Sequence, residues 1–148
     1  ENGDPIIGPD GQPLTVDVRD IPASERFFAG GDTSVRGFQL DRLGRPDTFD
    51  SDGTPIGGHA EIIMNGEARL ALWRDVGVVG FLDLGNVFSV VNDVSMGKLR
   101  AGAGFGIRYK SPVGPIRVDF GYKLGGLQTY GTEKEHRFAL HISIGQAF

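Results

Sequence analysis

The residue types that most often carry out catalysis or bind metals are few in this chain and widely separated. The histidines, His59, His136 and His141, lack the close spacing that is typical of a metal site. Ser34 and Ser143 have no accompanying histidine and aspartate that would make either a nucleophile. The chain has no cysteine, which excludes a thiolate site and a disulfide framework. We therefore predict no enzyme, no metal and no cofactor.

Two further segments have only a superficial likeness to ligand-binding motifs. Residues 83–86, Asp-Leu-Gly-Asn, are similar to the start of an acidic calcium loop, but the remaining ligands of such a loop do not follow. Residues 102–106, Gly-Ala-Gly-Phe-Gly, lie inside an alternating segment and not at the strand-to-helix turn that a nucleotide fingerprint requires. We expect His141, on the polar side of another alternating segment, to face a lumen or a seam.

The segments that hold these residues alternate between polar and apolar side chains. A period of two is typical of β-strands, and it predicts five of them, at residues 59–73, 76–88, 99–110, 116–124 and 137–148. Glycine makes up 24 of the 148 residues, and much of it lies inside these segments, as barrel walls tolerate. Short turns alternate with longer polar loops along the series. This is the plan of an up-and-down membrane barrel.

The last predicted strand has the most regular pattern. Its apolar face consists of Phe138, Leu140, Ile142, Ile144 and Phe148, interrupted only at Gln146. About 11 residues is the length of one membrane-spanning strand, and a terminal aromatic suits an interface anchor. No run of eighteen apolar residues exists, which excludes a transmembrane helix. A soluble β-sandwich, with the polar faces in solvent, remains the alternative.

Residues 1–58 differ from the rest of the chain. They hold six of the eight prolines and show no sustained periodicity, so we expect a long loop that is held by something larger. Residues 26–38 are richer in aromatics than a linker. The net charge of −4 argues against nucleic acid as a partner. Because the chain starts without methionine, we expect it to be part of a longer protein.

Four segments, in order, resemble the C-terminal part of the BamA/TamA family of outer-membrane assembly and translocation barrels, which carry the bacterial surface antigen domain. They are residues 27–38, 80–88, 106–122 and 144–148. The resemblance implies an all-β fold, an antiparallel up-and-down transmembrane β-barrel. This chain would be a C-terminal fragment of it, with a long inward-folding extracellular loop at residues 1–58 and five strands at residues 59–148.

The resemblance also implies roles for the loop. Its tip is formed by Val35, Arg36, Gly37 and Phe38. In the family the equivalent arginine folds back into the lumen and pairs with acidic wall residues, and Glu67 and Asp83 occupy the matching positions. A guanidinium can bind carboxylates bidentately and offset two close negative charges. Gly30 and Gly31 would allow tight bends. A solvated arginine and ordinary turn glycines are the alternatives.

For function, the resemblance implies assembly and insertion, or translocation, of proteins at the bacterial outer membrane. The terminal strand would form a weak seam with the first strand of the whole barrel, and Gly145 would weaken that seam further. The implied partners are outer-membrane lipids, client barrel proteins or a secreted substrate, periplasmic chaperones and accessory lipoproteins, with no nucleic acid. The alternatives are a two-partner secretion transporter, or a passive barrel that serves as anchor or pore for a fused domain.

Overall fold

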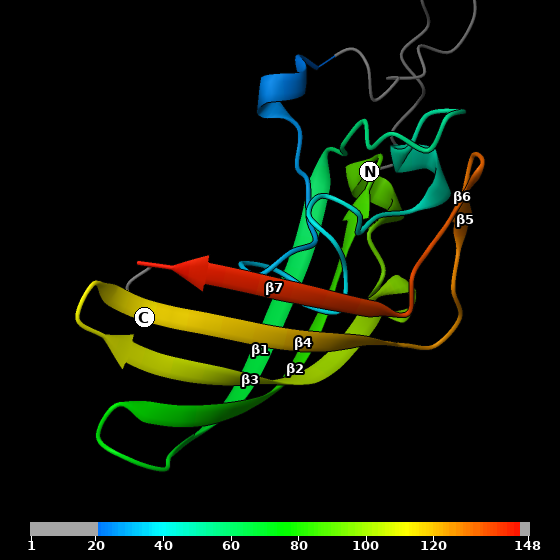
Figure 1. Ribbon diagram of the computed structural model, residues 1–148. Coiled ribbons are helices and arrows are strands. Elements are labelled where there is room, and N and C mark those ends of the chain that lie inside the picture. Colours follow the sequence, from blue (N-terminus) through cyan, green and yellow to red (C-terminus); the bar gives the residue numbers. More distant parts are fainter. Residues whose placement is uncertain (1–20, 146–148) are drawn as a thin grey trace, which may run out of the picture.

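The computed structural model describes residues 21–145, whose regular secondary structure is mainly β-strand (Figure 1). The strands are β1 (Ala60–Ala71), β2 (Val76–Phe88), β3 (Arg100–Ser111), β4 (Gly114–Leu124), β5 (Thr129–Tyr130), β6 (Glu133–Lys134) and β7 (Phe138–Ile144). Short 3-10 helices are η2 (Ala23–Glu25), η3 (Pro46–Thr48), η4 (Val91–Asp93) and η5 (Met96–Lys98). No helix within residues 21–145 has the length and apolar character needed to cross a membrane.

Five strands form one sheet in the order β1-β2-β3-β4-β7, and each is antiparallel to the next. Neighbours in the sheet thus follow one another along the chain, which is the up-and-down arrangement. The predicted all-β antiparallel fold with five strands is confirmed. Strands β1 and β7 form the two edges, and within residues 21–145 they pair with no further strand, so the barrel is not closed by this part of the chain.

The strand bounds agree closely with the alternation in the sequence, except at the C-terminal end. Strand β2 has the predicted bounds, and β1, β3 and β4 differ by one or two residues. The predicted strand at 137–148 is wrong at Gly145, because this residue adopts a φ of 80° and leaves the extended conformation after Ile144. Gly145 therefore lies after β7 and not in it. Phe148, assigned to the same strand from the sequence, lies outside the described residues.

Alternation along the strands separates an outer face of the sheet from an inner face. Large apolar side chains on the outer face are exposed, among them Phe105 at 61% and Ile142 at 64%. On the inner face Asp83, Asp119 and Lys123 are buried. This is the reverse of a soluble domain, in which charges face water and apolar groups form the core. It is the distribution of a barrel wall with lipid outside and a polar interior.

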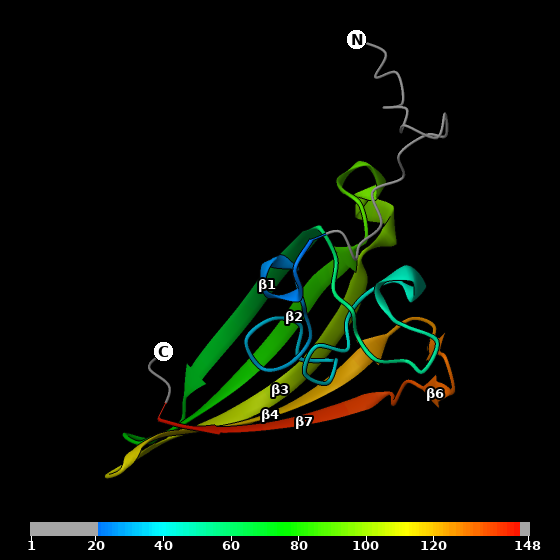
Figure 2. The same ribbon diagram turned by 90° about the horizontal axis from the view of Figure 1, so that it is seen from above.

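Within residues 21–58, the loop drawn in cyan lies within the curve of the sheet (Figure 2). Isolated bridges hold the segment together, joining Phe27 to Gly58, Ala29 to Leu43 and Phe49 to Pro55. Its buried apolar side chains form a small core with one residue of β2; the members are Ala29, Val35, Phe38, Leu43 and Val87. The segment has no regular periodicity because its conformation depends on packing against the sheet.

A second folded segment lies where the long loops meet. Strands β5 and β6 form a small hairpin inside the longer polar loop between the predicted strands at 116–124 and 137–148 (Figure 1). Its Tyr130 stacks on Phe49 of the first loop, with ring centroids 3.8 Å apart, and the Tyr130 hydroxyl donates to the carbonyl of Gly44 at 2.9 Å. Two-residue strands carry no periodic signal, which is why the sequence did not indicate this hairpin.

Candidate functional site

The guanidinium of Arg36 lies on the inner face of the sheet and contacts both acids that were named from the sequence. Its Nε and Nη2 donate to the two carboxylate oxygens of Asp83, at 2.8 Å and 2.7 Å. Its Nη1 forms an ion pair with Glu67. The backbone N–H of Arg36 also donates to Asp83, at 3.0 Å. The loop arginine is therefore buried in an ion-pair network between β1 and β2 and is not solvated.

Neighbouring side chains complete this network. Asn65, which faces Asp83 across the β1–β2 ladder, donates to Asp83 Oδ1 at 2.9 Å and to the carbonyl of Ser34 at 2.5 Å. Arg69 donates to the second oxygen of Glu67 at 2.8 Å. The Phe81 ring lies under the guanidinium of Arg36, with 3.8 Å from Cζ to the ring centroid. Each buried charge thus has a partner, which burial of charge requires.

Glycines of the wall allow the loop tip to lie directly on the sheet. A Cβ added to Gly102 of β3 would come within 2.9 Å of the Gly37 backbone, and one added to Gly121 of β4 would collide with the carbonyl of Arg36. At Gly85 of β2 it would come within 2.9 Å of the Val35 side chain. Backbone contact between loop and wall therefore needs glycine at positions 102 and 121, and close packing of the Val35 side chain needs it at position 85.

Phe38 forms a second attachment of the tip, at β3 and β4. Its ring is fully buried and lies against two cations, with Arg100 Cζ and Lys123 Nζ 4.7 Å and 4.6 Å from the ring centroid. Arg100 donates to both carboxylate oxygens of Glu135, at 2.5 Å and 2.6 Å. The sequence left open whether the loop aromatics pack on the wall; Phe38 does, whereas Phe27 is 44% exposed.

The loop that follows β4 is held by the ion pair between Arg100 and Glu135. Burial favours the neutral form of Glu135, but hydrogen bonds from Arg100 and from the N–H of Gln128 outweigh burial and lower the pKa of this carboxyl. Burial raises the pKa of the Tyr130 hydroxyl, which accepts from Arg100 at 2.9 Å. Glu135 is therefore ionised at neutral pH and ties this loop to β3.

Asp119 is the centre of a third attachment, on β4. Arg108 donates to both of its oxygens, at 2.6 Å and 3.1 Å, and Arg117 donates at 3.0 Å. The Nη2 of Arg117 also donates to the carbonyl of Asp32 in the loop, at 2.9 Å. Sequence reasoning missed this cluster. The short turn at residues 112–113 places Arg108 opposite Arg117, and two facing cations were a signal that an acid lies nearby.

The two loop glycines form a bend that begins the tip. Gly30 and Gly31 have φ values of 110° and 107°, which side chains rarely adopt. The N–H of Gly30 donates to the hydroxyl of Ser34 at 2.8 Å, so Ser34 serves the bend. A Cβ at Gly30 would also collide with the carbonyl of Gln39.

The apolar residues of the terminal strand face outward, away from the loop tip. Phe138, Leu140, Ile142 and Ile144 are all more than half exposed. Ala139 and His141 lie on the opposite, inner face, and the Nε2 of His141 is 3.0 Å from the carbonyl of Arg36. The structure thus brings the loop tip and the terminal strand together at a residue that the sequence placed on a lumen or seam face.

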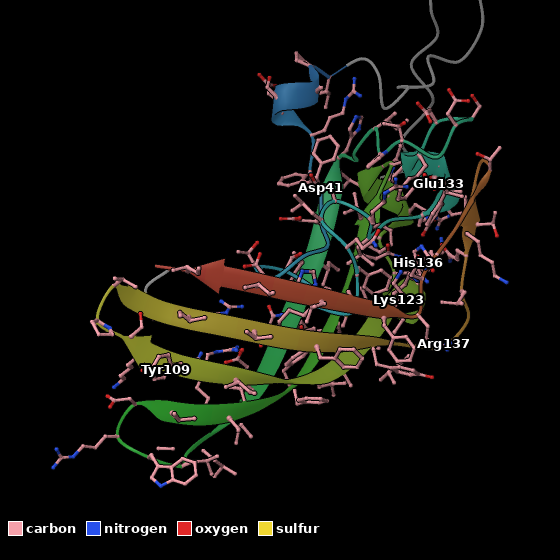
Figure 3. The ribbon with its side chains drawn as sticks, viewed as in Figure 1. Asp41, Tyr109, Lys123, Glu133, His136 and Arg137 are labelled. Atoms are coloured by element: carbon pink, nitrogen blue, oxygen red, sulfur yellow. The ribbon has the colours of Figure 1, made fainter. Side chains whose placement is uncertain are left out.

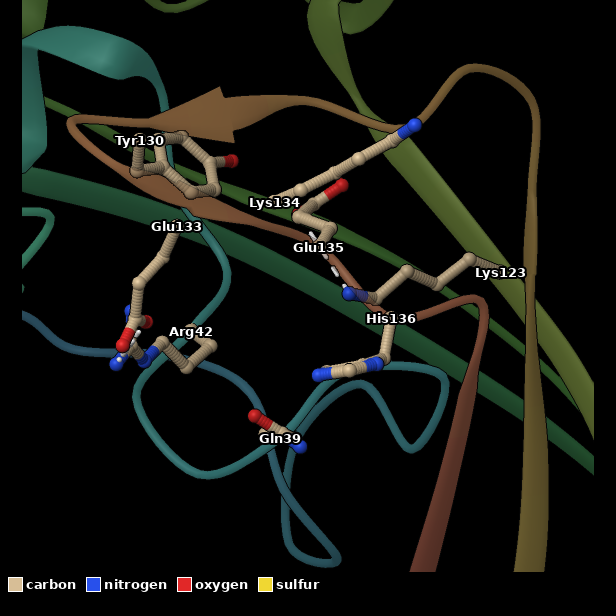
Figure 4. Close-up of a pocket in the computed structure, with 8 residues that line it drawn as sticks. All are labelled: Gln39, Arg42, Lys123, Tyr130, Glu133, Lys134, Glu135 and His136. Atoms are coloured by element: carbon tan, nitrogen blue, oxygen red, sulfur yellow. Dashed lines mark ion pairs between the residues drawn. The ribbon is translucent and has the colours of Figure 1, made fainter.

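A cavity of about 360 Å³ lies between the loop and the β5–β6 hairpin (Figure 4). Four of its charged lining residues form ion pairs: Arg42 with Glu133 at 2.7 Å and Lys123 with Glu135 at 3.6 Å. Figure 3 shows Lys123 and Glu133 at this end of the molecule, and Tyr109 at the other.

Residues 21–145 contain no cluster of three or more His, Cys, Asp or Glu side chains suited to a metal ion. The arrangement holds protein segments together.

The family is decided by a comparison with protein-family profiles. The profile of the Omp85 superfamily domain matches residues 11–148. The chain belongs to the Omp85 superfamily. It is part of an outer-membrane protein, which agrees with the exposed apolar outer face of the sheet and with the predicted location.

Two curated Omp85 relatives are similar to this chain over most of its length. The outer membrane protein assembly factor BamA of Nitratidesulfovibrio vulgaris is 30% identical over 132 residues, which cover 87% of this chain and 16% of the relative. The chloroplastic outer envelope protein 80 of Arabidopsis thaliana is 26% identical over 126 residues, 82% of this chain and 15% of the relative. The chain thus spans about a sixth of the length of these relatives.

A solved structure has the same fold. The crystal structure of BamA from Haemophilus ducreyi lacking POTRA domains 1–3 matches with a TM-score of 0.59 and 23% sequence identity. The match covers 81% of this chain and 27% of that chain. The five-stranded sheet is therefore similar to part of a larger Omp85 structure.

Proposed function

We propose that this Omp85 chain is the C-terminal barrel segment of a protein that assembles and inserts other proteins into the outer membrane. One observation carries the proposal: the profile of the Omp85 superfamily domain matches residues 11–148, and β7 is the last strand of the sheet within residues 21–145. The name of the Nitratidesulfovibrio relative, an outer membrane protein assembly factor, agrees with it.

The open edge suggests how such a protein would act. An unpaired strand edge presents a row of N–H and C=O groups onto which another strand can add. Strand β7 spans seven residues and its partner β4 eleven, so the ladder between them is short. In the complete barrel the outer edge of β7 would form a weak seam with the first strand. A client strand would replace that first strand by hydrogen bonding, with no covalent step, so we propose no enzymatic activity.

The loop tip would keep this wall in shape while the seam opens. Arg36, Phe38 and Arg117 attach the loop to all five strands of the sheet or to the side chains they carry. Because these attachments use buried ion pairs, the wall would keep its curvature when one edge is exposed. The client strands would come from unfolded barrel proteins. Chaperones that deliver them and accessory lipoproteins would be further partners.

The test is a cross-link in the complete protein. A cysteine at Leu140, on β7, is paired with a cysteine on the first strand of the barrel and then oxidised. Client assembly, measured by insertion of a barrel protein into membranes, should stop and recover on reduction. The matched control joins Val118 to Ile142 through cysteines, since these residues already face each other across the β4–β7 ladder. That control should assemble clients normally.

Other outcomes separate the alternatives. If the seam-locked protein assembles clients as fast as the unlocked protein, the proposal is wrong. If the complete protein exports one dedicated substrate and inserts no barrel protein, it is a two-partner secretion transporter. If neither process depends on it, the barrel is a passive anchor or pore.

A further inference from the structure

Arg36 contacts opposite edges of the sheet at the same time. Its side chain binds Glu67 on β1 and Asp83 on β2. Its carbonyl lies 3.0 Å from Nε2 of His141 on β7. Strands β1 and β7 are the first and last of the five-stranded sheet. One residue of the loop tip therefore links the first edge strand to the last across the inner face.

The chemistry of the His141 contact sets the direction of the hydrogen bond. A backbone carbonyl only accepts, so the Nε2 of His141 must carry the proton and donate. The neutral tautomer with Nε2–H and the imidazolium both meet this requirement. The neighbouring carboxylate, Asp119, lies opposite His141 in the β4–β7 ladder but is already bound by Arg108 and Arg117. The loop carbonyl is thus the acceptor that remains for this ring nitrogen.

The wall is shaped for this contact. The carbonyl of Arg36 passes directly over Gly121 of β4, and any Cβ at that position would collide with it. Gly121 is opposite Ala139, which precedes His141 by two residues on the same inner face. The next inward residue, Ser143, makes no side-chain hydrogen bond to the loop within the described residues. The link between tip and terminal strand therefore depends on His141.

We infer that His141 is the positioning residue through which the loop tip holds the terminal strand. Its role rests on the proposed function, because the edge it steadies is the one that a client strand would use. When the tip is seated, β7 has a partner on its inner face in addition to its ladder with β4. When the tip moves away, that partner is lost and the seam strand pairs less firmly with the wall.

The inference is tested by amide hydrogen exchange in the complete protein in lipid. His141→Phe keeps an aromatic ring but removes the donor. His141→Gln keeps an N–H donor at a similar distance from Cα. Ser143→Ala is the matched control on the same face. We expect His141→Phe to raise the exchange rates of the β7 amides about threefold to tenfold, the loss of one hydrogen bond, and to leave the β1 and β2 amides unchanged. His141→Gln and Ser143→Ala should remain close to wild type.

Three results would overturn the inference. They are unchanged exchange of β7 in His141→Phe, an equal rise in all strands, and His141→Gln behaving as His141→Phe. Exchange does not require a client, so the two proposals can fail separately. If β7 exchange responds as expected but the locked seam still assembles clients, the link stands and the proposed function falls. If the locked seam stops assembly while β7 exchange is unaffected by His141→Phe, the proposed function stands and the inference about His141 is wrong.

Discussion

The inner and outer faces of the sheet are made from the same five strands but differ in how specific their side-chain contacts are. The inner face holds Asp83 and Asp119, both buried and each bound by arginine. The outer face carries exposed apolar side chains such as Phe105 and Leu140. On the inner face each charge depends on a particular partner at a particular distance. On the outer face any apolar side chain of suitable size would serve, because lipid imposes no specific geometry.

This difference predicts where the chain tolerates change. A buried carboxylate that loses its cation keeps the cost of its desolvation without the gain from pairing. An outward apolar residue replaced by another apolar residue loses little. The inner face should therefore be sensitive to the identity of a side chain, and the outer face only to its polarity.

The largest effect is expected at the centre of the inner network. Arg36→Ala leaves Asp83 fully buried without its main partner and should destabilise the complete protein by about 3–5 kcal/mol. Arg36→Lys should recover part of this, since a lysine cannot make the bidentate contact. The measurement is the free energy of unfolding in urea. Arg69→Ala, at an exposed arginine of the same network, should cost under about 1 kcal/mol, and a loss equal to that of Arg36→Ala would contradict the prediction.

The next effect tests polarity on the outer face. Phe105→Arg places a charge halfway along β3, on the side that faces lipid, and should cost about 2–4 kcal/mol. Val113→Arg makes the same kind of change in the turn between β3 and β4, at the end of the wall, and should cost about 0–1 kcal/mol. Unfolding in lipid vesicles measures both variants. Equal costs would mean that the outer face is not immersed in lipid as described.

A smaller effect separates glycines that the loop requires from glycines that it does not. Gly121→Ala forces a Cβ into the carbonyl of Arg36 and should cost about 1–3 kcal/mol through overpacking. Gly80→Ala, in β2, meets nothing within 4 Å and should be close to neutral. The comparison uses the free energy of unfolding and the protease sensitivity of residues 21–58. If both variants behave alike, close packing of the tip on the wall is not what the glycine provides.

The smallest effect concerns pH at the second attachment. The pKa of Glu135 is lower in the folded protein than in the unfolded chain, so its contribution is complete above its ordinary pKa of about 4.3. It is lost as the pH falls through the lower, folded value. The stability gap between wild type and Glu135→Gln should be about 1 kcal/mol at pH 7 and should shrink as the pH falls below the ordinary pKa of the carboxyl. Glu133→Gln, at an exposed acid, should show little gap at either pH.

The strands could be predicted from the sequence because their signal is local. A period of two over ten or more residues depends only on which side of the sheet each residue faces, and β2 has the predicted bounds for this reason. The same argument failed at Gly145, where the alternation continues in the sequence but the backbone leaves the extended conformation. Alternation reports faces and cannot report a single backbone dihedral angle.

Only part of the candidate site could be predicted from the sequence. Family resemblance named Arg36 with Glu67 and Asp83, and the structure places all three together. The partners in the other attachments, Asp119 and Glu135, were missed. Nothing in the spacing of Arg100 and Glu135 indicates that they meet, because they lie far apart in the chain. Asp119 is close in the chain to Arg108 and Arg117, but the contact from Arg117 to the carbonyl of Asp32 joins distant segments.

The sequence by itself determined the strand pattern, the two chemically distinct faces and the resemblance that led to the loop tip. These properties follow from side-chain order along one strand. Only the tertiary structure decided that Arg36 reaches both edges of the sheet, that Gly121 leaves room for its carbonyl and that His141 donates a hydrogen bond to that carbonyl. Those contacts depend on how far the sheet curves and how deep the loop lies, and both are set by packing among residues that are distant in sequence.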